Sequence, residues 1–219
     1  MNEAARAALE STRRSYEAAT LDEASVAGDP FAQFARWLDD ALAVEGLSEP
    51  NAMTLATIDA GGSPDARIVL LRGFDARGFT FFTNYASRKG AELAARPRAA
   101  LLFFWAPLER QVRIEGSVTR LSAEESDAYF AQRPRGHRLS AWASPQSRVV
   151  PNRATLEAAM REVDARFAGV EVPRPEHWGG FRVAGERFEF WQGRRDRVHD
   201  RIAYEPDTPD GWRILRLAP

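Results

Sequence analysis

The sequence predicts a mainly β protein, an antiparallel barrel of about six to eight strands with helices on its outside. Three observations lead to this fold class. Apolar and β-branched runs recur along the chain and are separated by short turns. Helix-start signals interrupt these runs only at isolated places. The 219 residues contain no repeat or low-complexity linker and are 44% hydrophobic, so we expect one domain preceded by an arm.

The N-terminal region divides into this arm and the start of the domain. Residues 1–28 are polar, rich in alanine and without clear periodicity, which predicts a mobile arm with some helix, and residues 29–219 are expected to form the domain. Asp29 followed by Pro30 has the pattern of an N-cap and a first helical residue. Apolar side chains then follow at helical spacing, and Gly46 ends the predicted helix.

The remaining elements follow from the alternation of side chains and from helix caps. Ser122 with Glu125 forms a capping-box pattern, which predicts a helix that ends near Arg133. Ser87 is a good N-cap for a short helix, and an amphipathic pattern predicts a longer helix later in the chain. Strands are expected at 51–59, 66–74, 79–84, 99–105, 111–121, 181–193, 197–206 and 211–219, and the two further helices at 88–95 and 152–168.

Composition excludes several classes of protein. The chain has no cysteine, which rules out disulfides, zinc-thiolate sites and cysteine nucleophiles and favours a reducing, cytoplasmic location. The net charge of −1 gives no support to general nucleic-acid binding. No apolar run reaches the roughly 18 residues of a membrane span, and the N-terminus lacks the apolar stretch of a signal peptide. The three histidines show no metal-ligand spacing, so we expect no metal site.

One predicted helix start carries an unusual concentration of positive charge. Of the 30 basic residues only Lys89 is a lysine, and it follows Arg88 directly after the cap Ser87. Two cations in a first turn oppose the helix dipole, which favours anions there. A bound anion, held by backbone N–H groups and these two side chains, explains the pattern. The alternative is a solvated first turn.

A second basic cluster lies near the C-terminus. In a strand the side chains of Arg197, His199 and Arg201 share one face, and such a face calls for a counter-charge or a planar partner. Trp191 lies shortly before them and is either a core residue or the wall of a site for a flat ring. The solvated outer face of an edge strand is the alternative for the basic cluster.

A third group has the chemistry of a phosphate site. Tyr129 and Arg133 stand four residues apart on the predicted helix, so a hydroxyl and a guanidinium point the same way, although ordinary surface pairing also explains them. Arg67 and Arg72 bracket an apolar run. Because they stand five apart in a predicted strand, we expect them to face opposite sides and to need separate partners.

Together these segments resemble the pyridoxamine 5′-phosphate oxidase family, in order, over residues 13–219. The most specific stretches are RIVLLR (67–72), FFTNYASRKG (81–90), LERQVRIEG (108–116), RPRGHRLSAWASPQS (133–147), HWGGFRV (177–183), FEFWQG (188–193) and RVHDR (197–201). The resemblance implies an FMN-binding split β-barrel and a homodimer with FMN at the subunit interface. It also implies oxidation of pyridoxamine or pyridoxine 5′-phosphate by O2, which yields pyridoxal 5′-phosphate and H2O2.

The resemblance assigns roles to residues by position. Contacts to FMN are implied for Arg67, Arg72, Phe82, Thr83, Arg88, Lys89, Gln111, Gln146, Ser147, Trp191 and Arg201. Contacts to the substrate are implied for Arg72, Tyr129, Arg133, His137, Arg197 and His199, and for Arg13, Arg14 and Tyr16 of the arm. Arg197 and His199 would carry the catalytic role, with Arg197 placing the pyridine ring and His199 beside it.

Two positions depart from the commonest family pattern. Arg72 stands where lysine is usual and His137 where serine is frequent, and both family residues contact the substrate phosphate. Arginine keeps the charge but presents a planar fork, so the replacement is not neutral. We expect any difference in substrate affinity from the family to arise at these two positions.

Two other functions remain open. One is a related FMN oxidase that acts on another ring, of the phenazine-pathway type, and the other is a non-catalytic protein that binds flavin or pyridoxal phosphate.

Overall fold

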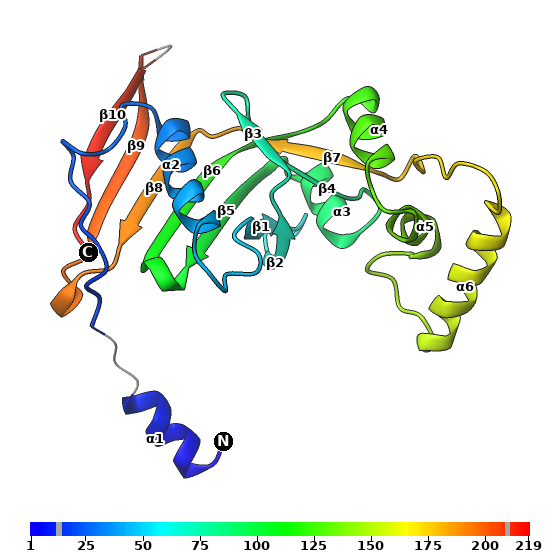
Figure 1. Cartoon of the computed structure of the whole chain (residues 1–219), viewed down its shortest axis with the longest axis horizontal. Coiled ribbons are helices and arrows are strands. Elements are labelled where there is room, and N and C mark those ends of the chain that lie inside the picture. The colour runs from blue at the N-terminus through cyan, green and yellow to red at the C-terminus, as the bar shows by residue number, and fades with distance from the viewer. Residues whose placement is uncertain (12–14, 209–210) are drawn as a thin grey trace. The chain divides into compact units, whose positions relative to one another are not determined.

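The computed structural model describes residues 1–11, 15–208 and 211–219 (Figure 1). Within them the chain divides into two compact units. Unit 1 consists of Met1–Pro50, Phe104–Val112 and Phe188–Pro219. Unit 2 consists of Asn51–Phe103 and Arg113–Arg187.

Unit 1 is organised around an antiparallel run of strands with one helix packed on it. The strands are β8 (Arg187–Gln192), β9 (Asp200–Thr208) and β10 (Gly211–Arg216), and the helices are α1 (Glu3–Ser11) and α2 (Pro30–Leu42). The Asp29 carboxylate accepts a hydrogen bond from the Ala32 N–H, so α2 begins as the cap pattern predicts. Trp37 of α2 meets Phe190 of β8 edge to face at 5.2 Å, which places the apolar face of α2 on the sheet.

Unit 2 holds most of the remaining strands and all four later helices. The strands are β1 (Ala52–Ile58), β2 (Pro64–Leu70), β3 (Gly73–Asp75), β4 (Gly78–Asn84) and β7 (Trp178–Val183), and the helices are α3 (Arg88–Ala95), α4 (Ala123–Ala131), α5 (Arg135–Ala143) and α6 (Arg153–Arg166). Residues of β5 (Arg98–Trp105) and β6 (Arg110–Arg120) belong to both units, and the 3-10 helix η1 (Ala106–Leu108) joins these strands. The pairs β1–β2, β1–β5, β3–β4 and β4–β7 are antiparallel, with β1 between β2 and β5 and β4 between β3 and β7. Figure 1 shows α5 and α6 side by side at one end of unit 2.

The predicted fold class, mainly β with flanking helices, is confirmed. The capping box at Ser122 and Glu125 begins α4, and Ser87 caps α3, both as expected. The strand count was too low, because the described residues contain ten strands. The stretches 66–74 and 181–193, each expected as one strand, are both interrupted by a short irregular segment. Helix α5 was not predicted, since no side chain caps its start.

The start predicted for the strand at 197–206 was also wrong, because the strand begins later. Residues Arg195–Arg197 form the 3-10 turn η2, and β9 starts only at Asp200. Asp196 and Arg197 have left-handed backbones, with φ of 56° and 62°. Side chains do not alternate across such a turn, so Arg197 and His199 do not share a strand face with Arg201.

Candidate functional site

A cavity of about 610 Å³ in unit 2 gathers many of the predicted ligand-binding residues. Its lining comes from β2, β4, α3, α4, the start of α5 and β7. Four arginine or lysine side chains face it, and the aromatic, hydroxyl and amide groups among its other lining residues suit a planar, phosphorylated ligand. The predicted site residues that line it are Arg67, Arg72, Phe82, Thr83, Lys89, Tyr129, Arg133, His137 and Gln146.

Arg67 and Arg72 line the same cavity, which corrects the expectation that they face opposite sides. The expectation failed because β2 ends at Leu70. Arg72 lies beyond the strand, in the irregular segment before β3, so the alternation of a strand no longer decides where its side chain points.

Lys89 provides a cation whose hydrogen-bond partners are neutral. Its Nζ lies 3.1 Å from Gln146 Oε1 and 3.4 Å from Thr83 Oγ1. Burial lowers the pKa of Lys89, and the nearby charge of Arg67 lowers it further. A ligand phosphate at this point would stabilise the charged ammonium, so the chemistry of this end of the cavity fits an anion.

Two carboxylates that the sequence reasoning missed hold the neighbouring arginines. Glu92, only 4% exposed, accepts hydrogen bonds from Thr57, Arg67 and Arg88. Asp65 pairs with the same two arginines at 2.6 and 3.0 Å. The spacing of Arg88 and Glu92, four apart on α3, was the available signal for this network.

Arg133 and Arg72 are the other two cations of the cavity. Arg133 lies against a stack of aromatic rings. Phe82 stacks on Tyr129 at 3.8 Å and on Trp178 at 5.6 Å. The guanidinium carbon of Arg133 lies 4.4 Å from the centre of the Trp178 ring. Its Nη1 is buried and has no hydrogen-bond partner in the described part of the chain.

This orphaned nitrogen is the most direct sign of an anion-binding position. Burial lowers the pKa of the Arg133 guanidinium, Tyr129 partly opposes this, and the charge of Arg72 lowers the pKa further. The group nevertheless stays charged, and a buried charged donor without an acceptor is strongly destabilising. A phosphate bound by Arg133 and Arg72 would satisfy the donor. The hydroxyl of Tyr129 and the ring of His137 face the same cavity.

A separate group of predicted site residues lies in unit 1. The ring of His199 is 4.7 Å from that of Trp191, and Tyr16 of the arm meets both rings edge-on at 5.7 Å. The Arg194 N–H donates to His199 Nδ1 at 3.1 Å. Because a backbone N–H can only donate, the neutral imidazole carries its proton on Nε2. Burial and the charge of Arg197 lower the pKa of His199, and the smaller effect of Asp200 opposes them. The lowered pKa favours the neutral form.

The other predicted residues have mixed surroundings. Arg201 is engaged inside unit 1, since it donates to Glu189 Oε1 at 2.9 Å and to the Ala218 carbonyl at 2.7 Å. Gln111 is half-buried on β6, and Ser147 has a left-handed backbone with φ of 71° after α5. Arg88 lies beside the cavity network, with 62% of its side chain exposed. Arg13 and Arg14 lie outside the described residues.

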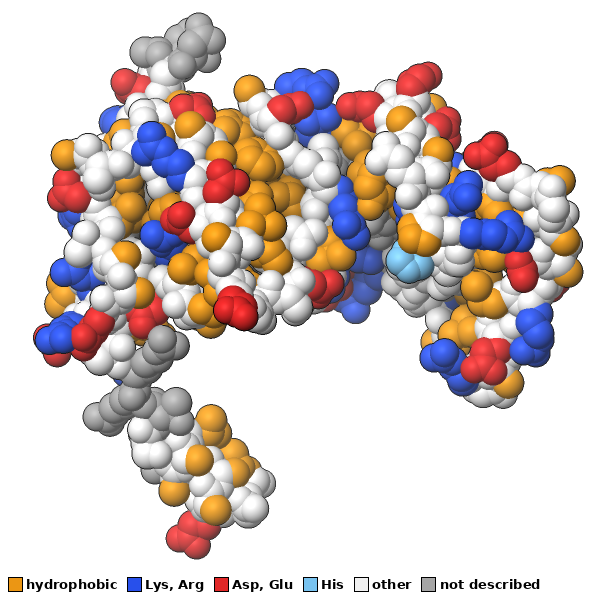
Figure 2. All heavy atoms as spheres, in the orientation of Figure 1, with side chains coloured by type: hydrophobic (Ala, Val, Ile, Leu, Met, Phe, Trp, Pro, Cys, Tyr) orange, Lys and Arg blue, Asp and Glu red, His pale blue; other side chains and the backbone are white. Residues whose placement is uncertain are grey.

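Residues 1–11, 15–208 and 211–219 contain no cluster of His, Asp and Glu that could hold a metal ion. Among them there is also no helix with the length and hydrophobicity to cross a membrane. On the face drawn in Figure 2, basic and acidic side chains are interspersed, in keeping with a net charge of −1.

Comparison with known families gives two matches that together cover most of the chain. The model described as pyridoxamine 5′-phosphate oxidase matches residues 39–167. The model described as the pyridoxine 5′-phosphate oxidase C-terminal dimerisation region matches residues 178–219. The second match supports a homodimer.

Curated relatives agree with these matches. The chain is 62% identical to a pyridoxine/pyridoxamine 5′-phosphate oxidase of Bordetella petrii, over 94% of this chain and 97% of the relative. It is 59% identical to the protein of that name from Burkholderia lata, over 96% and 99% of the two chains.

Solved structures give the same fold. PhzG from Burkholderia lata, determined in complex with tetrahydrophenazine-1-carboxylic acid, is 31% identical, with a TM-score of 0.84 over 94% of this chain and 100% of that one. A pyridoxamine 5′-phosphate oxidase-related, FMN-binding protein from Nostoc punctiforme is 16% identical, with a TM-score of 0.70 over 89% and 100% of the two chains. The expected split-barrel fold is therefore confirmed.

Proposed function

Because the chain belongs to the pyridoxamine 5′-phosphate oxidase family, we propose that it oxidises pyridoxine or pyridoxamine 5′-phosphate to pyridoxal 5′-phosphate, with FMN as cofactor and O2 as acceptor. One observation carries the proposal. The unit 2 cavity has two groups of cations, one at Lys89 and Arg67 and one at Arg133 and Arg72. FMN and the substrate each bring one phosphate, so two cation groups at one cavity match the two ligands.

The first cation group would hold the FMN phosphate. Lys89 contributes an ammonium with neutral partners, and Thr83 and Gln146 already lie within hydrogen-bond reach of it. Arg67 contributes a guanidinium that Glu92 and Asp65 hold in place. Bound FMN would supply the chemistry, by accepting a hydride from the carbon attached to the pyridine ring and passing two electrons to O2 to give H2O2.

The second cation group would hold the substrate phosphate. The orphaned Nη1 of Arg133 supplies a donor that needs an acceptor, and Arg72 adds a second guanidinium at the same cavity. Binding energy from the phosphate, which does not react, fixes the position of the ring that does react. A substrate without a phosphate would leave the Arg133 donor unsatisfied.

His199 and Arg197 would act on the pyridine ring itself. With its proton on Nε2, neutral His199 is a hydrogen-bond donor, so we expect it to orient a substrate oxygen rather than to act as a strong base. Arg197 would place the ring through its planar, permanently charged guanidinium. In a homodimer with FMN at the interface, residues of one protomer and of its partner both contribute to each site.

An oxidase of the phenazine type is the second candidate, because PhzG matches this chain with a TM-score of 0.84. Burkholderia lata provides a direct comparison, since it has both proteins. The chain is 59% identical to its pyridoxine/pyridoxamine 5′-phosphate oxidase and 31% identical to its PhzG. This difference, and the two cation groups, favour the phosphorylated substrate.

The test is turnover in air by the purified protein loaded with FMN. We expect pyridoxine 5′-phosphate and pyridoxamine 5′-phosphate to yield the aldehyde product with one H2O2 for each molecule oxidised. The amine substrate also takes up one water and releases one ammonia, and unphosphorylated pyridoxine should react poorly. Equal turnover of the phosphorylated and unphosphorylated compounds would contradict the assignment of Arg133. Tight binding of FMN without turnover would instead favour a non-catalytic binding protein.

A further inference from the structure

Lys89 is the only lysine of the sequence, so its side chain and the N-terminal amine are the only aliphatic amines of the chain. The Lys89 side chain lines the unit 2 cavity, where Nζ donates to Gln146 Oε1 at 3.1 Å and to Thr83 Oγ1 at 3.4 Å. Both acceptors are neutral. The one side-chain amine of the protein therefore lies in the proposed ligand cavity, held by groups that do not fix its charge.

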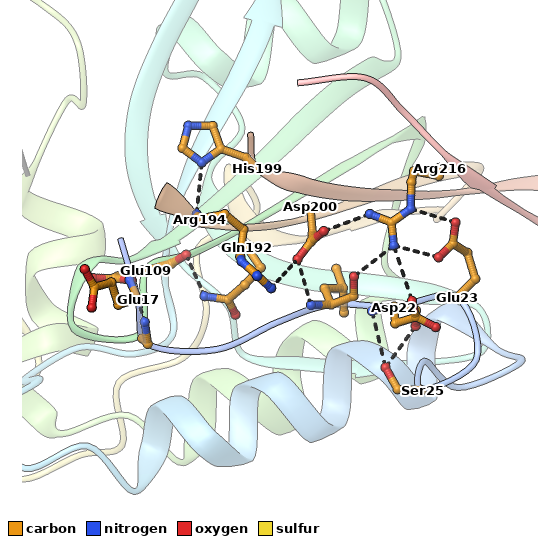
Figure 3. Close-up of polar contacts among 12 residues, drawn as sticks. Glu17, Asp22, Glu23, Ser25, Glu109, Gln192, Arg194, His199, Asp200 and Arg216 are labelled. Atoms are coloured by element: carbon orange, nitrogen blue, oxygen red, sulfur yellow. Dashed lines mark hydrogen bonds and ion pairs between the residues drawn. The ribbon is translucent and has the colours of Figure 1, made fainter. Parts of the chain in front are cut away.

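A cation held by carboxylates shows the contrast. Arg216 of unit 1 pairs with Glu23 at 2.6 Å and with Asp200 at 2.8 Å (Figure 3). Its hydrogen bonds to these two carboxylates raise the pKa of Arg216, because an opposite charge favours the charged form. The amide and hydroxyl partners of Lys89 hold its side chain in place without this effect.

The surroundings of Lys89 favour the neutral amine, which is the nucleophilic form. Burial lowers the pKa of Lys89 and the charge of Arg67 lowers it further, while Glu92 and Asp65 oppose the shift. A lower pKa leaves a larger neutral fraction of the amine at a given pH. Lysines in such surroundings are the ones that form imines with carbonyl compounds.

The same cavity has places for the other parts of an aromatic aldehyde phosphate. The orphaned Nη1 of Arg133, together with Arg72, offers a position for the phosphate. The stacked rings of Phe82 and Tyr129 offer a wall for a flat ring. An aldehyde on such a ring would be held in one cavity of about 610 Å³ with the amine, and confinement of this kind accelerates a reaction between two groups.

We propose that Lys89 forms an imine with an aromatic aldehyde phosphate, specifically pyridoxal 5′-phosphate, when FMN does not occupy the cavity. The neutral Nζ attacks the aldehyde carbon and a C–N bond forms. The carbonyl oxygen then leaves as water with the two hydrogens of the amine, which gives a C=N bond with no oxidation or reduction. The choice of pyridoxal 5′-phosphate rests on the proposed function, since it is the product there, whereas the reactivity of the amine does not.

Binding of FMN and formation of the imine exclude each other, because both use Lys89. A phosphate bound at Nζ would raise the pKa of Lys89 and keep it as an unreactive ammonium. The imine in turn would remove the cation that is proposed to hold the FMN phosphate. Accumulated product would therefore slow the loading of flavin-free protein with FMN.

The test is chemical labelling of the full chain, freed of flavin, with pyridoxal 5′-phosphate. Borohydride then adds a hydride to the imine carbon and makes the C–N bond permanent, and peptide mass spectrometry locates the label. The N-terminal amine is the internal reference, since Met1 is 89% exposed and lies outside the cavity. We expect Lys89 to be labelled at a concentration about tenfold or more below that needed for the reference. Labelling of the reference without Lys89 would overturn the proposal.

Competitors show whether the reaction takes place in the phosphate-binding cavity. FMN and inorganic phosphate should each suppress labelling of Lys89 while the N-terminal amine reacts as before, and riboflavin should protect less than FMN at the same concentration. Labelling of Lys89 that none of these compounds changes would show an ordinary surface amine and would overturn the proposal.

Lys89→Arg is the matched variant, because it keeps the positive charge but has no amine that can form an imine. Treatment with pyridoxal 5′-phosphate and borohydride, followed by removal of the reagents, should abolish FMN binding by the wild-type protein and leave that of Lys89→Arg at its untreated level. Equal losses in both proteins would contradict the assignment to Lys89. Turnover without labelling would overturn only this proposal, whereas labelling without turnover would overturn only the proposed function.

Discussion

Replacing Lys89 with alanine should weaken the binding of FMN far more than the binding of riboflavin, which lacks the phosphate. A hydrogen bond to a charged group contributes roughly 1.5–3 kcal/mol. Lys89 is only half-buried, so solvent screening places the loss near the lower value. A loss of about 1.5 kcal/mol corresponds to roughly a tenfold increase in the Kd of FMN.

The assay is a flavin titration of the apoprotein that follows the quenching of flavin fluorescence. Four Kd values are needed, for FMN and riboflavin with the wild-type protein and with Lys89→Ala. Arg77→Ala serves as the control, because Arg77 is an exposed cation of the same unit that pairs with Asp75 and does not line the cavity. If Lys89→Ala weakens both flavins equally, the ammonium stabilises the fold and does not bind the phosphate.

Three other changes give distinct expectations. Arg133→Met should raise KM for pyridoxine 5′-phosphate by about tenfold or more while FMN remains bound, since it removes a charged donor from the proposed phosphate site; a KM unchanged in steady-state assays would refute this role. Arg72→Lys should leave activity largely intact whereas Arg72→Ala should raise KM, and an unchanged KM in Arg72→Ala would make Arg72 a surface charge. Arg197→Met should retain the yellow flavin and the fold but lose most of kcat/KM, as kinetics and circular dichroism together can show, and near-normal turnover would contradict its placing role.

Much of the fold could be predicted because local signals were strong. The caps at Asp29, Ser87 and Ser122 identified three helix starts, since each side chain satisfies backbone N–H groups of its own helix. Helix α5 was missed for the same physical reason, as it begins without a side-chain cap. The left-handed turn at Asp196 and Arg197 was missed because nothing in their side chains requires that backbone conformation.

The candidate site could be predicted as a set of residue types but not as a geometry. The resemblance pointed to Lys89 and Arg133, and both line the cavity of unit 2. Glu92 carried only the weak signal of its spacing from Arg88, because its bond to Arg67 joins residues that are 25 apart in the sequence. Long-range contacts of this kind are fixed by the packing of the strands and cannot be derived from local patterns.

The proposed function depends on the transfer of electrons from a phosphorylated pyridine substrate to bound FMN. The most direct measurement is the absorbance of the FMN-loaded protein without oxygen, after addition of pyridoxine 5′-phosphate. We expect the yellow absorbance to be lost and to return when air is admitted, and unphosphorylated pyridoxine at the same concentration to have little effect. A flavin spectrum that pyridoxine 5′-phosphate and pyridoxamine 5′-phosphate both leave oxidised would contradict it.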